Sequence, residues 1–84
     1  MPTIEIATTN RWDALALAGK LPTYHWYLVQ PDRVHWEVRI TVPDPVTSLP
    51  SDLRRVVEGW LRDRQLERTS IRAGGSTFDV APTN

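Results

Sequence analysis

The strongest pattern of hydrophobic and polar positions in the chain lies between residues 24 and 42. In the second half of this stretch, apolar side chains occupy every second position and polar side chains fill the positions between them. The apolar set is Val34, Trp36, Val38, Ile40 and Val42, and the polar set is His35, Glu37, Arg39 and Thr41. A period of two predicts a β-strand with one buried face.

The first half of the stretch, residues 24–30, is rich in aromatic and β-branched side chains and predicts another strand. Pro31 suits the second position of a type I turn, and Asp32 follows it. We therefore expect the two strands to fold back on each other as an antiparallel hairpin.

Two registers of this hairpin fit the pattern. A two-residue loop places Tyr27 opposite Trp36, whereas a three-residue bulged loop places Leu28 there. The first register turns inward His25, Tyr27 and Val29. The second turns inward Tyr24, Trp26 and Leu28. We favour the second register because it buries more apolar surface.

The N-terminal segment predicts a strand followed by a helix. Residues 3–8 alternate, so Ile4 and Ile6 are expected to point inward. Asn10 is placed to cap a helix over residues 11–18, which is rich in alanine and leucine.

A second helix is predicted to begin after Ser51, its expected N-cap, and to continue to about residue 66. Its apolar side chains recur at helical spacing and define one stripe. The stripe consists of Leu53, Val56, Val57, Trp60 and Leu61.

The C-terminal segment predicts a second hairpin. Residues 69–73 and 76–80 read as strands, and Gly74–Gly75 is typical of a tight two-residue turn. This loop length places Ile71 opposite Phe78 and Thr69 opposite Val80.

These elements follow one another as β-α-β-β-α-β with an extra C-terminal strand, which is the split β-α-β or ferredoxin-like arrangement. Right-handed crossovers would place both helices on one face of an antiparallel sheet and order the first four strands 4-1-3-2. Residues 1–84 are expected to form a single α+β domain with a frayed tail at 81–84. The four Trp, contributed by both helices and both strands of the first hairpin, are expected to share its core.

Composition narrows the function classes. Ten basic and ten acidic residues cancel, which argues against generic nucleic-acid binding. The absence of Cys excludes disulfides, thiolate nucleophiles and iron–sulfur clusters. With no signal peptide and no membrane span recognised, we expect a cytoplasmic protein. The excess of Arg over Lys is typical of a GC-rich bacterial genome.

No residue set predicts a metal site, a cofactor or a catalytic centre. His25 and His35 are the only histidines, and neither has enough partners for a closed zinc site. His35 and Glu37 share a strand face and could serve as a base with its orienting carboxylate. An alternating polar face produces such neighbours without catalysis, so we assign no catalytic residue.

The Arg-rich segment over residues 54–72 does not indicate a nucleic-acid-binding site. Asp63, Glu58 and Glu67 interleave with its arginines, which is typical of a solvated, salt-bridged helix face. Nucleic acid is therefore not an expected partner.

The edge of the predicted sheet gives the leading functional hypothesis. In the expected strand order, residues 24–30 form an aromatic edge without Lys, and an unprotected edge can pair with another strand. We expect a non-enzymatic interaction or regulatory module that associates with another protein or with a second copy of itself. The expected interaction surface consists of Tyr24, Trp26, Tyr27, His35, Glu37 and Arg39.

Two alternatives remain. One is a small cofactor-independent enzyme with a pocket between the sheet and the helices, for which Tyr27, His35 and Trp36 are the residues of interest. The other is an RNA-binding module that uses the open face of the sheet.

Overall fold

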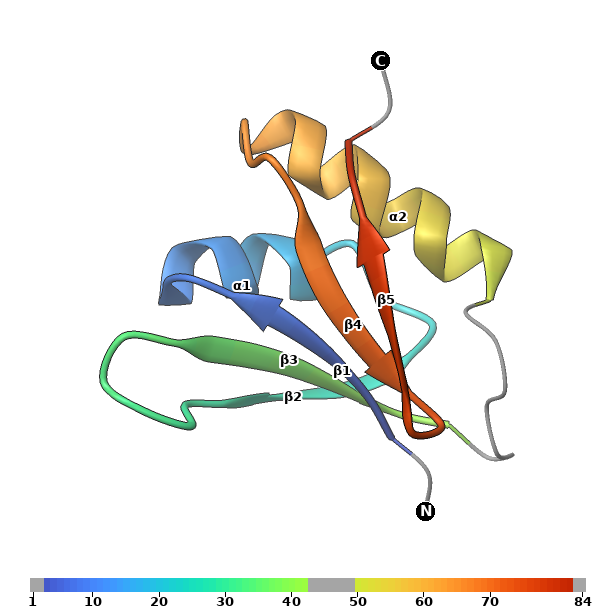
Figure 1. Cartoon of the computed structure of the whole chain (residues 1–84), viewed down its shortest axis with the longest axis horizontal. Coiled ribbons are helices and arrows are strands. Elements are labelled where there is room, and N and C mark those ends of the chain that lie inside the picture. The colour runs from blue at the N-terminus through green and yellow to red at the C-terminus, as the bar shows by residue number, and fades with distance from the viewer. Residues whose placement is uncertain (1–2, 43–49, 83–84) are drawn as a thin grey trace.

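The computed structural model describes residues 3–42 and 50–82 of the chain. Residues 43–49, between the first predicted hairpin and the second predicted helix, and the last two residues of the predicted tail lie outside this range. The elements in chain order are β1 (Thr3–Thr8), α1 (Arg11–Ala18), β2 (His25–Val29), β3 (Trp36–Thr41), α2 (Ser51–Asp63), β4 (Thr69–Ala73) and β5 (Ser76–Val80) (Figure 1).

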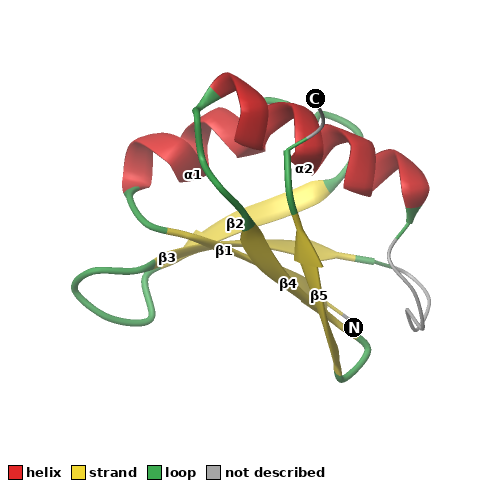
Figure 2. Cartoon of the chain, turned by 45° about the horizontal axis from the view of Figure 1, so that its top comes forward, coloured by secondary structure: helices red, strands yellow, loops and turns green. Residues whose placement is uncertain are grey.

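The five strands form one antiparallel sheet in the order β2-β3-β1-β4-β5. Strands β2 and β5 are therefore its edges, and β1 lies at its centre. Both helices cover the same face, which leaves the other face open (Figure 2). The prediction of an α+β fold with an antiparallel sheet and two helices is confirmed.

The helix-covered face holds the hydrophobic core. Ile4 and Ile6 of β1 point into it, as predicted, and the apolar stripe of α2 packs above them. Fully buried side chains come from all layers: Ile4, Ile6, Leu17, Leu21, Val38, Ile40, Leu53, Val57, Trp60, Leu61, Ile71 and Val80. Burial of this apolar surface is the main force that holds the two layers together.

The prediction that all four Trp share the core is wrong. Trp60 is fully buried and donates its indole N–H to the carbonyl of Asp13 at 2.9 Å. Trp12 is 71% exposed, because the face of α1 that carries Ala14 and Leu17 is the one packed on the sheet. Trp26 is 40% exposed on an edge strand. An edge strand and the face of a helix that points away from the sheet are not covered by another layer of the fold in the described part of the chain, so large side chains there stay exposed.

Helix α1 begins as predicted. The Asn10 side chain accepts a hydrogen bond from the backbone N–H of Asp13 at 2.8 Å and donates one to its carboxylate at 2.9 Å. Asp13 is itself buried and accepts from Nε of Arg64 at 2.7 Å, so the cap also ties α1 to the end of α2. The predicted Ser51 cap is wrong: Ser51 is the first helical residue, and the N-cap is Pro50, which makes no side-chain capping bond.

The C-terminal hairpin has the predicted register. Ile71 lies opposite Phe78, and Thr69 lies opposite Val80. Gly74 and Gly75 have φ values of 59° and 81°, a left-handed conformation that glycine adopts without steric cost. The two-residue glycine turn therefore fixes the pairing of these strands.

The first hairpin differs from both predicted registers. Leu28 lies opposite Val38 and Trp26 lies opposite Ile40, so the inward side is the favoured one but the loop is longer. Val34, expected on the buried face, lies in this loop and is 67% exposed. The Asp32 carboxylate accepts hydrogen bonds from the backbone N–H groups of Val34 and His35, at 2.8 and 2.9 Å. This local cap replaces the strand ladder there.

Candidate interaction surface

Strand β2 is an edge of the sheet, as the sequence predicted, and it divides its aromatic side chains between two faces. Trp26 pairs with Ile40 and therefore lies on the helix side. Tyr27 pairs with Arg39 on the open side and is 43% exposed. Two residues of the predicted surface thus point in opposite directions. Both belong to a strand that is paired on one side only within the described part of the chain.

Tyr24 lies just before β2 and serves the fold as well as the surface. Its ring packs against the core, and its hydroxyl donates to the Asp52 carboxylate at 2.8 Å. Partial burial, together with the neighbouring carboxylate, raises the pKa of Tyr24. The same hydrogen bond lowers the pKa of Asp52. This contact joins the start of β2 to the first turn of α2.

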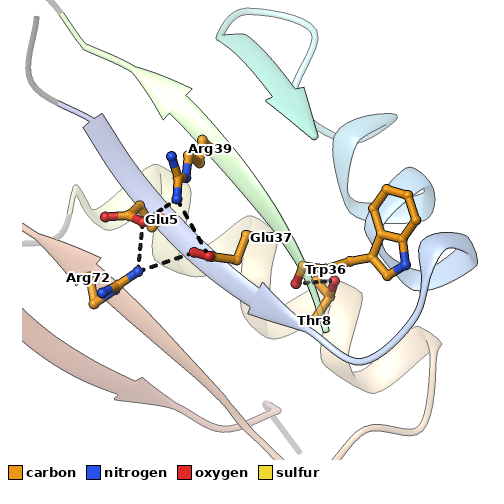
Figure 3. A network of polar contacts seen from close by, with 6 residues as sticks. All are labelled: Glu5, Thr8, Trp36, Glu37, Arg39 and Arg72. Carbon is orange, nitrogen blue, oxygen red and sulfur yellow. Dashed lines mark hydrogen bonds and ion pairs between the residues drawn. The ribbon is translucent and has the colours of Figure 1, made fainter. Parts of the chain in front are cut away.

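The open face of the sheet carries a ring of four charged side chains, Glu5, Glu37, Arg39 and Arg72, from three central strands (Figure 3). Nη2 of Arg72 lies 2.7 Å from Glu5 and 3.3 Å from Glu37. Nη2 of Arg39 lies 3.3 Å from Glu5 and 3.7 Å from Glu37. We call these four residues the charge ring. Each carboxylate contacts both guanidinium groups, so the charges compensate one another.

The ring is partly shielded from water. The Glu37 side chain is only 11% exposed, whereas that of Arg72 extends into solvent. Nε of Arg39 is buried and has no hydrogen-bond partner within the described part of the chain. A charged group in such a place costs desolvation free energy, which the opposite charges offset.

His35 lies outside β3, and its partner is not the one that the alternating pattern suggested. Nδ1 of His35 lies 2.8 Å from the Asp32 carboxylate, so Asp32 and not Glu37 orients the ring. The backbone N–H of Val34, followed by the His35 ring, lowers the pKa of Asp32. Both side chains are exposed. The pair is a side-chain contact within the loop over residues 30–35.

A hollow of about 250 Å³ lies on the open face, where this loop overhangs the sheet. His35 and Glu37, two residues of the predicted surface, line it. The remaining lining residues are Glu5, Ala7, Thr8, Pro31, Asp32, Trp36, Ser70, Arg72 and Thr77. The Trp36 indole itself packs toward α1, away from the charge ring (Figure 3). The hollow is thus on the face opposite to the one where an enzyme pocket was expected.

The structure brings together Glu37 and Arg39 in the charge ring, and it places Tyr27 beside Arg39. Sequence reasoning missed Glu5 and Asp32. The alternation of β1 gives a signal for Glu5, because it puts this residue on the same face as Glu37. Within residues 3–42 and 50–82, no three His, Cys, Asp or Glu side chains are grouped as a metal site. No helix in the described ranges is long and apolar enough to cross a membrane.

Comparisons with known proteins add no family to this picture. No family model matches the chain, and no curated protein or solved structure matches it either. Whatever is inferred about function therefore depends on the geometry of the edge strand β2, the charge ring and the hollow.

Proposed function

We propose that the protein is a non-enzymatic interaction module that associates with a second copy of itself by pairing two β2 strands. The observation that carries this proposal is the composition of a sheet edge that pairs with no further strand among residues 3–42 and 50–82. β2 contains no Asp, Glu, Lys or Arg, and both of its large aromatic side chains are exposed. Natural sheet edges are usually protected by charge, proline or a bulge.

The other edge of the sheet is different. β5 contains the charged Asp79 and the polar Ser76 and Thr77, and α2 contacts it from above. Asp79 also accepts a hydrogen bond from the Ser70 hydroxyl at 3.2 Å, which holds a charge at this edge. The contrast favours β2 as the pairing edge.

The side chains of β2 allow two copies of this strand to pair with each other in antiparallel orientation. An antiparallel pair centred on Tyr27 places Trp26 opposite Leu28 of the second copy on the helix side. It places His25 opposite Val29 of the second copy on the open side. No like charges meet in this register, and the aromatic–aliphatic pairs are of the kind that stabilise antiparallel strands.

The strand order also supports a ferredoxin-like topology, in which the first four strands lie 4-1-3-2 and β5 extends the sheet. In such an arrangement β2 is left free on one side, while β5 covers β4 on the other. This topology fixes no activity by itself.

Sedimentation equilibrium across a concentration series tests the proposal. The wild-type chain of 9.6 kDa is expected to reach twice that mass. The Trp26→Lys substitution places a charge on the edge and should weaken the dimer by about tenfold or more. Thr77→Lys is the matched control on β5 and should leave the dimer unchanged. Circular dichroism should show both variants folded, since both side chains are exposed.

A chain that stays monomeric up to about 100 μM, where even weak specific dimers form, would overturn the proposal. Equal loss of dimer in the Trp26→Lys and Thr77→Lys variants would overturn the assignment of β2 as the interface.

A further inference from the structure

The hollow beside the loop over residues 30–35 is a concave site that the β2 edge does not use. Its rim is held in place from both sides, because Asp32 fixes the loop and the charge ring fixes the sheet face. Ala7 and Pro31 supply apolar wall. A volume of about 250 Å³ lies at the small end of the range for ligand pockets. The site therefore suits a small ligand or a single side chain.

The charge of the walls favours a cation. Three carboxylates line the hollow, those of Glu5, Asp32 and Glu37, whereas Arg72 is its one guanidinium. Arg39, on the far side of the ring, neutralises one more carboxylate. One negative charge remains when His35 is neutral. Arg68 lines a neighbouring depression and is not among the residues that line this hollow.

The hydrogen-bonding groups around the hollow are mainly acceptors. Nδ1 of His35 faces the Asp32 carboxylate, which can only accept, so the neutral ring keeps its proton there and Nε2 is an acceptor. The Ser70 hydroxyl donates its hydrogen bond to the Asp79 carboxylate, so its oxygen is left as an acceptor. Both guanidinium groups contact Oε2 of Glu5 from the side of the charge ring.

We propose that this hollow binds the amine or guanidinium end of an organic cation. The nitrogen donors point to Asp32, Glu5 and Nε2 of His35, and a short aliphatic stem lies against Ala7 and Pro31. The same chemistry belongs to a free small amine and to the side chain of a basic residue in a partner. This site is independent of the proposed β2 interface, because the lining includes no residue of β2.

Nuclear magnetic resonance titration of the wild-type chain tests this assignment with three matched probes. n-Butylamine carries the charge, n-butanol is neutral, and butanoate has the opposite charge. The amine is expected to shift the backbone amides of His35, Ser70 and Thr77 with a Kd of about 1–10 mM, as for a ligand of few atoms. Butanol should bind more weakly, and butanoate should not shift these signals.

The blocked amino acid N-acetyl-lysine methylamide separates the two sources of the cation. Tighter binding of this probe than of n-butylamine indicates a basic side chain of a protein partner. Tighter binding of n-butylamine indicates a free small molecule. Both outcomes require the same hollow, and both support the site.

Charge removal gives the second arm of the test. Asp32→Asn keeps an oxygen acceptor for the loop backbone and should weaken amine binding about threefold or more, as expected for a partly exposed charge pair. Glu5→Gln should do the same without touching the loop. Asp63→Asn is the control, since Asp63 pairs with Lys20 away from the hollow, and it should change nothing.

Binding of butanoate as tight as that of butylamine would overturn the proposal. So would the absence of any saturable shift up to about 100 mM amine, far above the expected dissociation constant. An equal loss of amine affinity in the Asp63→Asn and Asp32→Asn variants would show that the overall charge of the protein, and not the hollow, attracts the amine. That result would also contradict the proposal. Because the Trp26→Lys variant should still bind the amine, failure of the dimer proposal is distinguishable from failure of this one.

Discussion

The two faces of the sheet differ in chemistry, although their residues alternate along the same strands: one face is apolar and buried, and the other is polar and open. On β3, Val38 and Ile40 are fully buried under the helices, whereas Glu37 and Arg39 alternate with them along the strand and lie on the open face. The covered face gains stability from apolar area removed from water. The open face instead places opposite charges so that each compensates another. Packing therefore holds the fold together, and the open face retains polar groups that a ligand or partner can contact.

The covered face should be the more sensitive of the two. Ile40→Ala removes three carbon atoms from a fully buried position and leaves a cavity under the helices, which typically costs about 2–5 kcal/mol. Thr41→Ala, at the next position on the open face, should cost less than about 1 kcal/mol. Urea unfolding of both variants measures the difference. Equal losses would contradict the assignment of the core to one face.

The charge ring should contribute less to the free energy of unfolding than the buried core does, but by a measurable amount. Glu37→Gln keeps the shape of the side chain and leaves both guanidinium groups with Glu5 alone. We expect a loss of about 1–2 kcal/mol, at the low end for a shielded ion pair because Arg72 is exposed. Salt should reduce this loss by screening.

Glu58→Gln is the matched control for the ring, since Glu58 pairs only loosely with Arg54 at 3.9 Å on the surface of α2. Its effect should stay within about 0.5 kcal/mol. A control that costs as much as Glu37→Gln would remove any special role for the ring.

The smallest effect concerns pH. Asp52 has a lowered pKa because of the Tyr24 hydroxyl, so this contact stabilises the fold at neutral pH and is lost as the pH falls below about 4. Burial raises the pKa of Tyr24, so its contribution is present below about pH 10 and is lost as the pH rises through the higher folded value.

Tyr24→Phe should flatten both limbs of the stability–pH curve while changing the value at pH 7 little. Asp63, whose pKa is lowered by its hydrogen bond with Lys20, should keep part of the acid limb. Thermal melts between about pH 3 and 11, spanning both pKa ranges, check this. Unchanged limbs in the variant would show that the hydrogen bond does not form in solution.

Local signals made some parts of this fold predictable. Gly74 and Gly75 specify a tight turn, and the alternation around them fixed the pairing of Ile71 with Phe78. The strand over residues 3–8 and the Asn10 cap were predictable for the same reason, because neighbouring residues carry the whole signal. The edge position of β2 followed from the order of the elements.

Other parts depend on contacts that a periodic pattern does not encode. Val34 continues the alternation of β3, yet Asp32 binds the backbone at that point and ends the strand. The same carboxylate contacts the His35 ring, which was expected to lie beside Glu37. Glu5 and Arg72 are 67 residues apart, so their meeting in the charge ring depends on the complete sheet. The hollow could not be predicted for that reason.

The central position of β1 bears on how the chain acquires its shape. β1 comes early in the chain, but its two neighbours, β3 and β4, come later, and the hydroxyl of Thr69 bonds to the carbonyl of Ala7 across a separation of 62 residues. Closing so large a loop costs chain entropy before the pairing repays it. Sheets of this connectivity belong among domains whose folding rate is limited by non-local contacts. On a ribosome, β1 would keep one edge open until residues 69–73 emerged.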